Sequence, residues 1–469
     1  MVKPKKEITV FEFDFVAKAI KAERGTSHPN VHTVTAKSYD YLKQMCLGEK
    51  SDRKLFKLRS IDGMEVLQVQ NYAGVIFTPD KTQIEVLPKI GRHLDAGEQG
   101  IQQARLSLIT MLRALKGFEH VQTASANIAA EKMPLLEVFI TQFLQSVNYL
   151  VKRGLRSDYA RREDNLSFLK GKLNIGKQLR HNLVNKHKLY CEYDEFLLDR
   201  PANRLLHSAL QKVKALTRSV SNQKLLQELA FVFHDIPKSQ DHQTDFIKLK
   251  LDRSMGHYHV PMQWCQLILN GYSPQSMKGA THAASLLFPM EKVFEDYVAK
   301  TLKDQLANKR SDLQLETQAS GKHLAVYQGK GKFSLRPDLL IKRGMYNKVV
   351  LDTKWKLLDS DVYNANISQS DIYQMFAYAK KYLNQGGGLE QGRELQQGRE
   401  LQQGRDVVLI YPMQPHFQQA LPAPFDLDDG HRLWVVPFDI VPKKSQCHWA
   451  EALLSSDESQ YFDHLVASA

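Results

Sequence analysis

Apolar and polar residues alternate along the first part of the chain, up to about residue 98. The segment ITVFEFDFV (8–16) places apolar side chains at nearly every second position, which predicts a strand with one buried face. The segment MEVLQVQNYAGVIF (64–77) has the same character, and a turn is expected at Pro79-Asp80. We therefore expect a β-rich N-terminal region over residues 1–98.

The spacing of apolar residues changes to the helical period after residue 98. Apolar side chains recur at positions i, i+3 and i+4 in three long segments, which predicts amphipathic helices. These segments are IQQARLSLITMLRALKGF (101–118), LLEVFITQFLQSVNYLVKRGL (135–155) and RLLHSALQKVKALTRSV (204–220). We therefore expect a mainly helical middle region over residues 99–280.

The last part of the chain, residues 281–469, mixes both periods. A helix is expected over ASLLFPMEKVFEDYVAKTLKDQL (284–306), followed by two strands, a second helix and two further strands. The order α-β-β-α-β-β predicts an α/β domain in which helices flank a mixed sheet. The later elements are FSLRPDLLIK (333–342), KVVLDTKWKLL (348–358), SDIYQMFAYAKKYL (370–383), DVVLIYP (406–412) and LWVVPFDIV (433–441). The whole chain is thus predicted to be a multidomain α+β protein.

A low-complexity tract interrupts this last region at residues 385–406. Three six-residue repeats, LEQGRE, LQQGRE and LQQGRD, follow three glycines there. So few charged, glutamine-rich repeats would bury almost no apolar surface. We expect a solvated insertion, flexible or partly helical, between two elements of the sheet.

Composition narrows the class of protein. The 64 Lys and Arg residues exceed the 51 Asp and Glu residues by 13, which favours a polyanionic partner. No apolar run approaches the roughly 18 residues that a membrane helix needs, and no apolar segment follows the basic start. The four cysteines are far apart, without metal-binding or disulfide spacing. We expect a cytoplasmic protein that is neither secreted nor bound to a membrane.

Two acidic residues on neighbouring predicted strands are the strongest candidates for chemistry. Asp338 follows Arg336-Pro337, and Asp352-Thr353-Lys354 comes fourteen residues later. Side chains alternate along a strand, so Asp352 and Lys354 share one face, and a turn at Gly344 would bring both carboxylates together. Two carboxylates suit Mg²⁺, while Lys354 would hold or deprotonate the attacking water or offset phosphate charge. The alternative is a solvated Asp–Lys ion pair of little consequence.

Further polar residues flank this pair. Glu295 borders the apolar face of the preceding helix and is a candidate metal ligand or base, or else an ordinary surface carboxylate. Gln374 and Tyr378 lie one turn apart on the following helix, where they would support the site or simply pack that face. Strand alternation also places Lys342 and Lys356 on the face of the proposed site.

The order Glu, Pro-Asp, Asp-x-Lys, Gln-x-x-x-Tyr resembles the PD-(D/E)xK nucleases, and its last element is similar to that of RecB-like nucleases. More specifically, the chain resembles the McrC family, the nuclease subunits of McrBC-type systems that restrict DNA carrying 5-methylcytosine. LDTKWK after LRPD is the most specific element, whereas the hexapeptide insertion and the length depart from the usual pattern. The matching segments are IEVLPKI (84–90), GLRSDYARREDNLSFLKGKL (154–173), CEYDEFLLDRPANRLL (191–206), FPMEKVFEDYV (288–298), LRPDLLI (335–341) and VLDTKWK (350–356).

This resemblance implies a Mg²⁺-dependent endonuclease subunit that cleaves double-stranded DNA. Asp338, Asp352 and Glu295 would hold the metal, Lys354 would act in catalysis, and Gln374 and Tyr378 would support the site. Residues 1–98 would dock onto a hexamer of McrB-like AAA+ GTPase subunits, which recognise the modified DNA and whose GTP hydrolysis the chain stimulates. A stand-alone RecB-like repair nuclease and a non-catalytic activator of the AAA+ ring remain as alternatives.

Other motifs carry less weight. GKLNIGKQ (171–178) approaches a phosphate-binding loop, but Gln178 stands where Ser or Thr would ligate Mg²⁺, so no nucleotide cofactor is expected. The group around His234-Asp235 lacks the further ligands of a metal-dependent phosphohydrolase, and His257, His259 and Cys265 have no zinc-site spacing. The basic run Lys152–Arg162 is a candidate for DNA or partner contact, or a solvated helix end.

Overall fold

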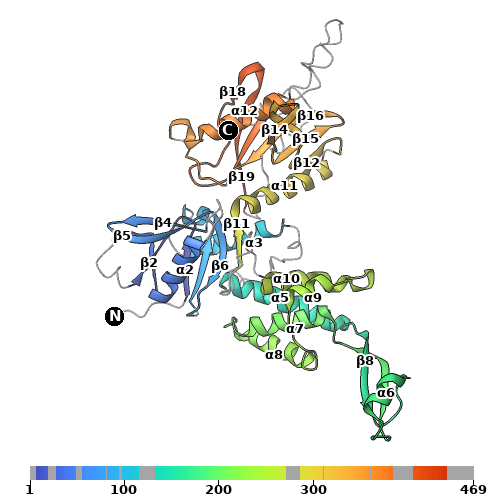
Figure 1. Ribbon diagram of the computed structural model, residues 1–469. Coiled ribbons are helices and arrows are strands. Elements are labelled where there is room, and N and C mark those ends of the chain that lie inside the picture. Colours follow the sequence, from blue (N-terminus) through green and yellow to red (C-terminus); the bar gives the residue numbers. More distant parts are fainter. Residues whose placement is uncertain are drawn as a thin grey trace. The chain divides into compact units, whose positions relative to one another are not determined.

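The computed structural model describes ten segments of the chain and divides it into two compact units, which are described separately (Figure 1). The first unit comprises Met1–Lys132, Pro274–Ala283 and Leu287–Ala469, and the second comprises Met133–Ser273 and Ala284–Leu286. The described residues are 7–19, 28–48, 55–80, 82–93, 98–115, 133–270, 286–309, 311–359, 362–383 and 405–440. The predicted insertion at 385–406 lies outside them except for its last two residues.

The N-terminal part of the first unit contains two four-stranded sheets, as its alternating sequence predicts. One has the order β1-β7-β6-β11 and the other the order β3-β2-β5-β4. Strand β1 is parallel to β7, and β2 is parallel to β3, while the β6–β7 and β4–β5 pairs are antiparallel. The strands are β1 (Glu7–Phe11), β2 (Phe15–Lys18), β3 (Val31–Val34), β4 (Phe56–Ile61), β5 (Met64–Val69), β6 (Tyr72–Phe77), β7 (Gln83–Leu87) and β11 (Leu286–Pro289).

Apolar side chains from both sheets form one core with helix α2 (Ala36–Gly48). Val10, Leu67 and Ile84 are fully buried in it. Helix α3 (Glu98–Leu112), which the sequence places in the middle region, instead contacts β7 and helix α11 (Met290–Lys309) of the same unit.

The start of α11 differs from the sequence-based expectation. A helix is expected from about residue 284, but residues Leu286–Pro289 form strand β11 at the edge of the first sheet. The short apolar run buries itself beside β6, and Pro289, which lacks an amide hydrogen, ends the strand. The helix then begins at Met290, whose N–H donates to Asn71 O at 3.0 Å.

The C-terminal part of the first unit is built on a six-stranded mixed sheet with the order β12-β15-β16-β17-β19-β18. Strand β15 is antiparallel to both of its neighbours, β12 and β16, whereas β16, β17 and β19 run parallel. All seven residues of β17 are buried, as expected for a strand covered on both faces. The strands are β12 (Gln314–Thr317), β15 (Leu339–Arg343), β16 (Tyr346–Thr353), β17 (Asp406–Pro412), β18 (Phe425–Asp426) and β19 (Arg432–Phe438).

Helices cover this sheet. Helix α12 (Gln369–Tyr378), extended by a π-helical turn at Ala379–Leu383, packs on the face that carries Val350 and Leu409. Residues that alternate with these, such as Leu351, are also fully buried, and α11 contacts β12 and β16. Between β12 and β15 the chain forms a two-stranded hairpin, β13 (Lys322–Tyr327) and β14 (Lys330–Leu335).

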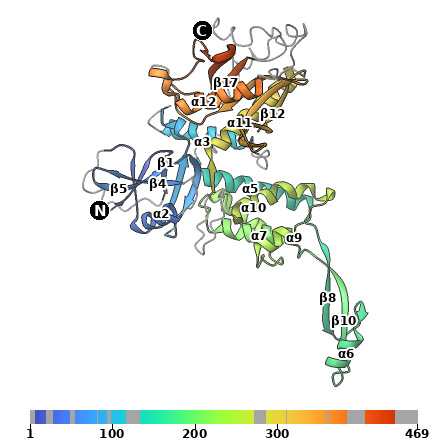
Figure 2. The same ribbon diagram turned by 45° about the horizontal axis from the view of Figure 1, so that its top comes forward.

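The second unit combines a helical bundle with a long two-stranded arm (Figure 2). In the arm, β8 pairs antiparallel with β10 over nine residues, and β9 and α6 lie in the connection. The apolar stripe of α5 is buried, with Phe143, Val147 and Leu150 at 0% exposure. The elements are α5 (Leu135–Arg153), β8 (Asp158–Leu166), β9 (Lys172–Leu173), α6 (Ile175–His181), β10 (Leu189–Leu197), α7 (Pro201–Lys214), α8 (Val220–Val232), α9 (His242–Lys248) and α10 (His259–Asn270).

The predicted combination of sheets and helices is therefore confirmed in its coarse form. None of the helices in the described ranges has the length and apolarity needed to cross a membrane.

Candidate active site

Strands β15 and β16 bring Asp338 and Asp352 together. The strands form the expected antiparallel hairpin, in which Gly344 takes the left-handed conformation (φ 58°) and Leu339 lies opposite Leu351. Asp338 immediately precedes this residue pair and Asp352 immediately follows it. The two carboxylates thus lie at the carboxyl end of β16.

Asp352 is almost completely buried, at 2% exposure. Its Oδ2 atom forms an ion pair with Lys354 Nζ at 2.5 Å, as strand alternation predicts. The contact lacks hydrogen-bond geometry, and no described residue is a hydrogen-bond partner of this oxygen. Burial, together with the negative charge of Asp338, raises the pKa of Asp352 to about 7, although Lys354 opposes the shift.

Lys354 has two further neighbours besides Asp352. Its Nζ donates to Gln374 Oε1 at 2.8 Å and lies 3.9 Å from Asp371 Oδ1. Burial alone lowers the pKa of an amine, but the surrounding carboxylates outweigh it and raise the pKa of Lys354. Lys354 is therefore a fixed positive charge in this acidic surrounding.

The predicted pair on α12 forms a hydrogen-bonded chain that reaches Lys354. Gln374 Nε2 donates to Tyr378 OH at 2.8 Å, and Tyr378 OH donates to Arg336 O at 2.9 Å. One helix face therefore holds both the lysine side chain and the backbone two residues before Asp338.

Asp338 is held by residues from two strands. Its Oδ2 accepts hydrogen bonds from the N–H and Oγ1 of Thr353, both at 2.8 Å. Its Oδ1 accepts from Gln318 Nε2 at 3.2 Å, and Gln318 N donates to Asp338 O at 2.8 Å. Gln318, in the left-handed conformation (φ 52°) just beyond β12, is a site residue that the sequence reasoning missed.

Glu295 is linked to this site by a hydrogen bond from Gln318. The amide Nε2 of Gln318 donates to Glu295 Oε1 at 2.7 Å as well as to Asp338, while Lys292 Nζ donates to Glu295 Oε1 at 2.7 Å. Burial and the charge of Asp338 raise the pKa of Glu295. In the described segments no three or more His, Cys, Asp or Glu side chains are grouped to hold a metal ion.

Asp371 is a second residue that the sequence reasoning missed. It is 5% exposed and lies in the first turn of α12, where Ser368 caps the helix by accepting from its N–H. Its Oδ2 accepts from Lys356 Nζ at 2.6 Å. Lys356 thus lies beside the site as expected. Lys342 instead pairs with Glu316, because β12 lies beside β15 and places Glu316 diagonally opposite Lys342.

The donor set fits a magnesium ion. Mg²⁺ binds one or two protein carboxylates and otherwise keeps waters or takes phosphate oxygens. Asp338 and Asp352 supply two carboxylates, and the buried Oδ2 of Asp352 has no hydrogen-bond donor from the described residues. Lys354 supplies a single positive charge beside both carboxylates, so a divalent cation would compensate the negative charge that remains.

A second buried network lies directly after Lys354 in the chain. Trp355 Nε1 donates to Glu12 Oε2 at 3.0 Å, and Lys89 Nζ donates to Trp355 O at 2.7 Å. Lys89 N also donates to Glu12 Oε2, at 2.9 Å. Burial raises the pKa of Glu12 to about 7 and lowers that of Lys89. This network joins the N-terminal sheets to the segment that directly follows β16 and contains Lys354.

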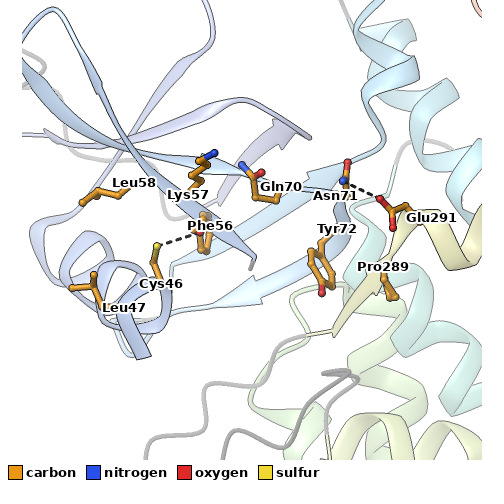
Figure 3. A pocket seen from close by; sticks show the side chains of 10 residues that line it. All are labelled: Cys46, Leu47, Phe56, Lys57, Leu58, Gln70, Asn71, Tyr72, Pro289 and Glu291. Carbon is orange, nitrogen blue, oxygen red and sulfur yellow. Dashed lines mark hydrogen bonds between the residues drawn. The ribbon is translucent and has the colours of Figure 1, made fainter. Parts of the chain in front are cut away.

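A pocket of about 630 Å³ lies in the N-terminal part of the same unit (Figure 3). Asn71 donates to Glu291 at its rim, at 3.3 Å. None of the predicted site residues lines it, so it is separate from the acidic site. Its walls are formed by Cys46, Leu47, Phe56, Lys57, Leu58, Gln70, Asn71, Tyr72, Pro289 and Glu291.

Comparison with known proteins assigns the chain to a family. Residues 67–389 match the family described as McrBC 5-methylcytosine restriction system component. This match covers more than half of the chain, and the chain belongs to this family. No curated protein matches the sequence.

Two solved structures are similar to the chain. A refined half-complex from the tetradecameric assembly of Thermococcus gammatolerans McrB AAA+ hexamers with bound McrC matches with a TM-score of 0.62. The identity is 18%, over 92% of this chain and 94% of that one. A second structure of the Thermococcus gammatolerans McrBC complex has a TM-score of 0.46, 20% identity, and covers 63% and 87% of the two chains. At these identities the likeness concerns the fold.

Proposed function

We propose that the chain is the Mg²⁺-dependent DNA endonuclease subunit of an McrBC-type restriction complex. The observation that carries this proposal is the cluster at the end of β16, in which Asp338 lies beside the almost completely buried carboxylate of Asp352 and its ion pair with Lys354. Membership of a restriction-system family and the fold shared with a chain of an McrB–McrC assembly support it.

The proposed roles follow from the contacts. Asp338 and Asp352 hold the metal, which when bound polarises a phosphate oxygen and makes a coordinated water more acidic. Lys354 directs its positive charge at the scissile phosphate or the water. Gln374 and Tyr378 fix Lys354 and the backbone before Asp338. Glu295 acts through Gln318, which it orients toward Asp338. This fold and site would be of the PD-(D/E)xK type.

The proposed partner is an AAA+ GTPase ring. The similar structure from Thermococcus gammatolerans contains McrB AAA+ hexamers with bound McrC. We propose that this chain likewise binds such a ring and stimulates its GTP hydrolysis, and that the ring selects the modified DNA. Cleavage would then depend on both the partner and GTP.

Substitution of the cluster tests the proposal. In plasmid cleavage assays with the partner ring, GTP and Mg²⁺, Asp338→Ala and Lys354→Ala should each lower the cleavage rate by about 10²-fold or more. Both variants should keep the fold, measured by circular dichroism, and should still stimulate GTP hydrolysis. Cleavage that survives either change would reject the site.

The same assay separates the alternative functions. Cleavage by the chain alone, without ring or GTP, would identify a stand-alone repair nuclease. Stimulation of GTP hydrolysis by a wild-type chain that never cuts methylated or unmethylated plasmid would identify a non-catalytic activator.

A further inference from the structure

The β13–β14 hairpin is a strongly basic surface beside the candidate active site. Residues 322–336 contain four Lys or Arg residues and no Asp or Glu. Lys330, Lys332 and Arg336 are exposed and Lys322 is half-buried. None of these four side chains forms an ion pair with another residue in the described part of the chain. The hairpin therefore presents positive charge that the described residues do not compensate through ion pairs.

The arm of the second unit is a useful contrast, because it too is a two-stranded antiparallel element. Residues 158–197 contain eight Lys or Arg but also six Asp or Glu. Four of its eight basic side chains, Arg161, Arg162, Lys170 and Lys177, form ion pairs with carboxylates of the arm itself. The arm thus balances much of its positive charge with its own carboxylates, whereas the β13–β14 hairpin contains no Asp or Glu to do so.

The hairpin also exposes apolar side chains. Phe333 is 75% exposed and Val326 is 72% exposed. Phe333 has a left-handed backbone (φ 57°), which is costly for an aromatic residue and is found where the surrounding structure or a function requires it. A tight two-residue turn at Gln328-Gly329, with positive φ at both residues, closes the hairpin.

Both ends of the hairpin are fixed to the acidic site. Tyr382 OH lies 3.1 Å from Ala319 O and 2.8 Å from Leu335 O, and so bridges the two strand ends. Gln318, just before β13, donates to Asp338, and Tyr378 holds Arg336 O just after β14. A ligand bound along the hairpin therefore lies in a defined position relative to Asp338.

We propose that the β13–β14 hairpin binds the duplex DNA that is cut at the Asp338–Asp352 site. Its lysines contact backbone phosphates, and Phe333 and Val326 contact the groove. A two-stranded ribbon fits the major groove of B-DNA, and positive charge without internal partners suits phosphate binding. This inference rests on the proposed endonuclease function. A second copy of the chain is a poor occupant, because two such hairpins would oppose like charges.

The test variant is Lys330→Gln/Lys332→Gln. Its affinity for a labelled DNA duplex of about 30 base pairs is measured by fluorescence anisotropy. The buffer contains EDTA, and the salt concentration is varied between about 50 and 200 mM. Loss of two phosphate contacts should weaken binding about tenfold and reduce the slope of log K against log salt by about 2. The matched control is Lys248→Gln/Lys250→Gln, an exposed pair with the same spacing in the second unit, which should change neither quantity.

A second variant tests the apolar contact. Phe333→Asn tolerates the left-handed backbone but removes the ring, so binding should weaken while the salt slope stays constant. In cleavage assays with ring and GTP, both variants should raise KM for DNA and leave kcat at saturating DNA within about twofold.

Several results would overturn the inference. One is that the wild-type chain fails to bind the duplex at the lowest salt concentration. Another is that the control variant weakens DNA binding as much as the test variant does. A third is that the hairpin variants bind DNA normally but no longer stimulate the ring. The last result would make the hairpin a protein-docking surface. The endonuclease function is judged separately by Asp338→Ala in a chain whose hairpin is unchanged. This variant must lose cleavage whether or not the hairpin binds DNA.

Discussion

The first unit contains two buried carboxylate–lysine pairs that differ in how completely they are hydrogen-bonded. Glu12 and Lys89 are 0% and 5% exposed, and Asp352 is 2% exposed beside Lys354. Burial raises the pKa of both carboxyl groups to about 7. The carboxylate of Glu12 accepts from Trp355 Nε1 and Lys89 N, whereas Asp352 Oδ2 lacks a hydrogen-bond partner in the described segments.

A shifted pKa by itself therefore does not identify a functional group in this chain. Structural networks and catalytic groups both desolvate their charges, and both shift their pKa values. What separates the two pairs is that N–H donors fix the carboxylate of Glu12, whereas the close neighbour of Asp352 Oδ2 is the ammonium group of Lys354, beside which a metal ion can share that oxygen. We expect substitutions at the first pair to change stability, and those at the second to change chemistry.

Asp352→Asn should have the largest effect. Loss of a metal-binding carboxylate should lower the cleavage rate by about 10³-fold. The matched control is Asp406→Asn, at the far end of the neighbouring strand, where Asp406 Oδ1 accepts from Arg432 Nε and Trp434 Nε1, both at 2.9 Å. This control should cost about 1–3 kcal/mol in the free energy of unfolding and leave kcat nearly unchanged. Equal losses of kcat in the two variants would show that Asp352 is no more important for the chemistry than Asp406.

Lys89→Met should have the next largest effect, which is a decrease in the free energy of unfolding. Loss of the Lys89 charge leaves the buried Glu12 carboxylate without the positive charge that opposes its desolvation, which should cost about 3–5 kcal/mol, measured by urea unfolding at pH 8. The variant Glu12→Gln/Lys89→Met removes both charges and should recover most of that loss. Because Trp355 follows Lys354, a modest change in kcat is expected. Abolished cleavage at unchanged stability would make the Glu12–Lys89 pair part of the active site.

The sequence predicts the elements around the site better than the contacts within it. The hairpin of β15 and β16, the turn at Gly344 and the shared face of Asp352 and Lys354 follow from a period of two and one glycine. The Gln374–Tyr378 contact follows equally from helical spacing. These features are local, so nearby residues determine them.

Features that depend on distant segments were not predictable in this way. Gln318 reaches Asp338 because β12 pairs with β15, and its side chain has no motif of its own. The contact of Glu12 with Trp355 joins residues 343 positions apart. The position of Asp371 in the first turn of a helix was predictable, since Ser368 three residues earlier is a good N-cap. The strand at Leu286–Pro289 forms only because β6 offers it an edge.

The smallest expected effect concerns pH, and it compares the two carboxyl groups directly. A raised pKa favours the folded state at low pH, and that stabilisation is lost as the pH rises toward about 7, so Glu12 and Asp352 change the metal-free stability in the same direction. Mg²⁺ binding separates them, because only Asp352 must lose its proton to bind the ion.

Mg²⁺ affinity, measured by calorimetry without DNA, should therefore be about tenfold weaker at pH 6 than at pH 8. Near pH 6, binding should release close to one proton, detected by comparing buffers of different ionisation enthalpy. Glu12→Gln should keep both the pH dependence and the proton release, since its carboxylate is already saturated by N–H donors. If Glu12→Gln removed the proton release instead, the metal-linked carboxyl group would be Glu12, and the roles of the two pairs would have to be exchanged.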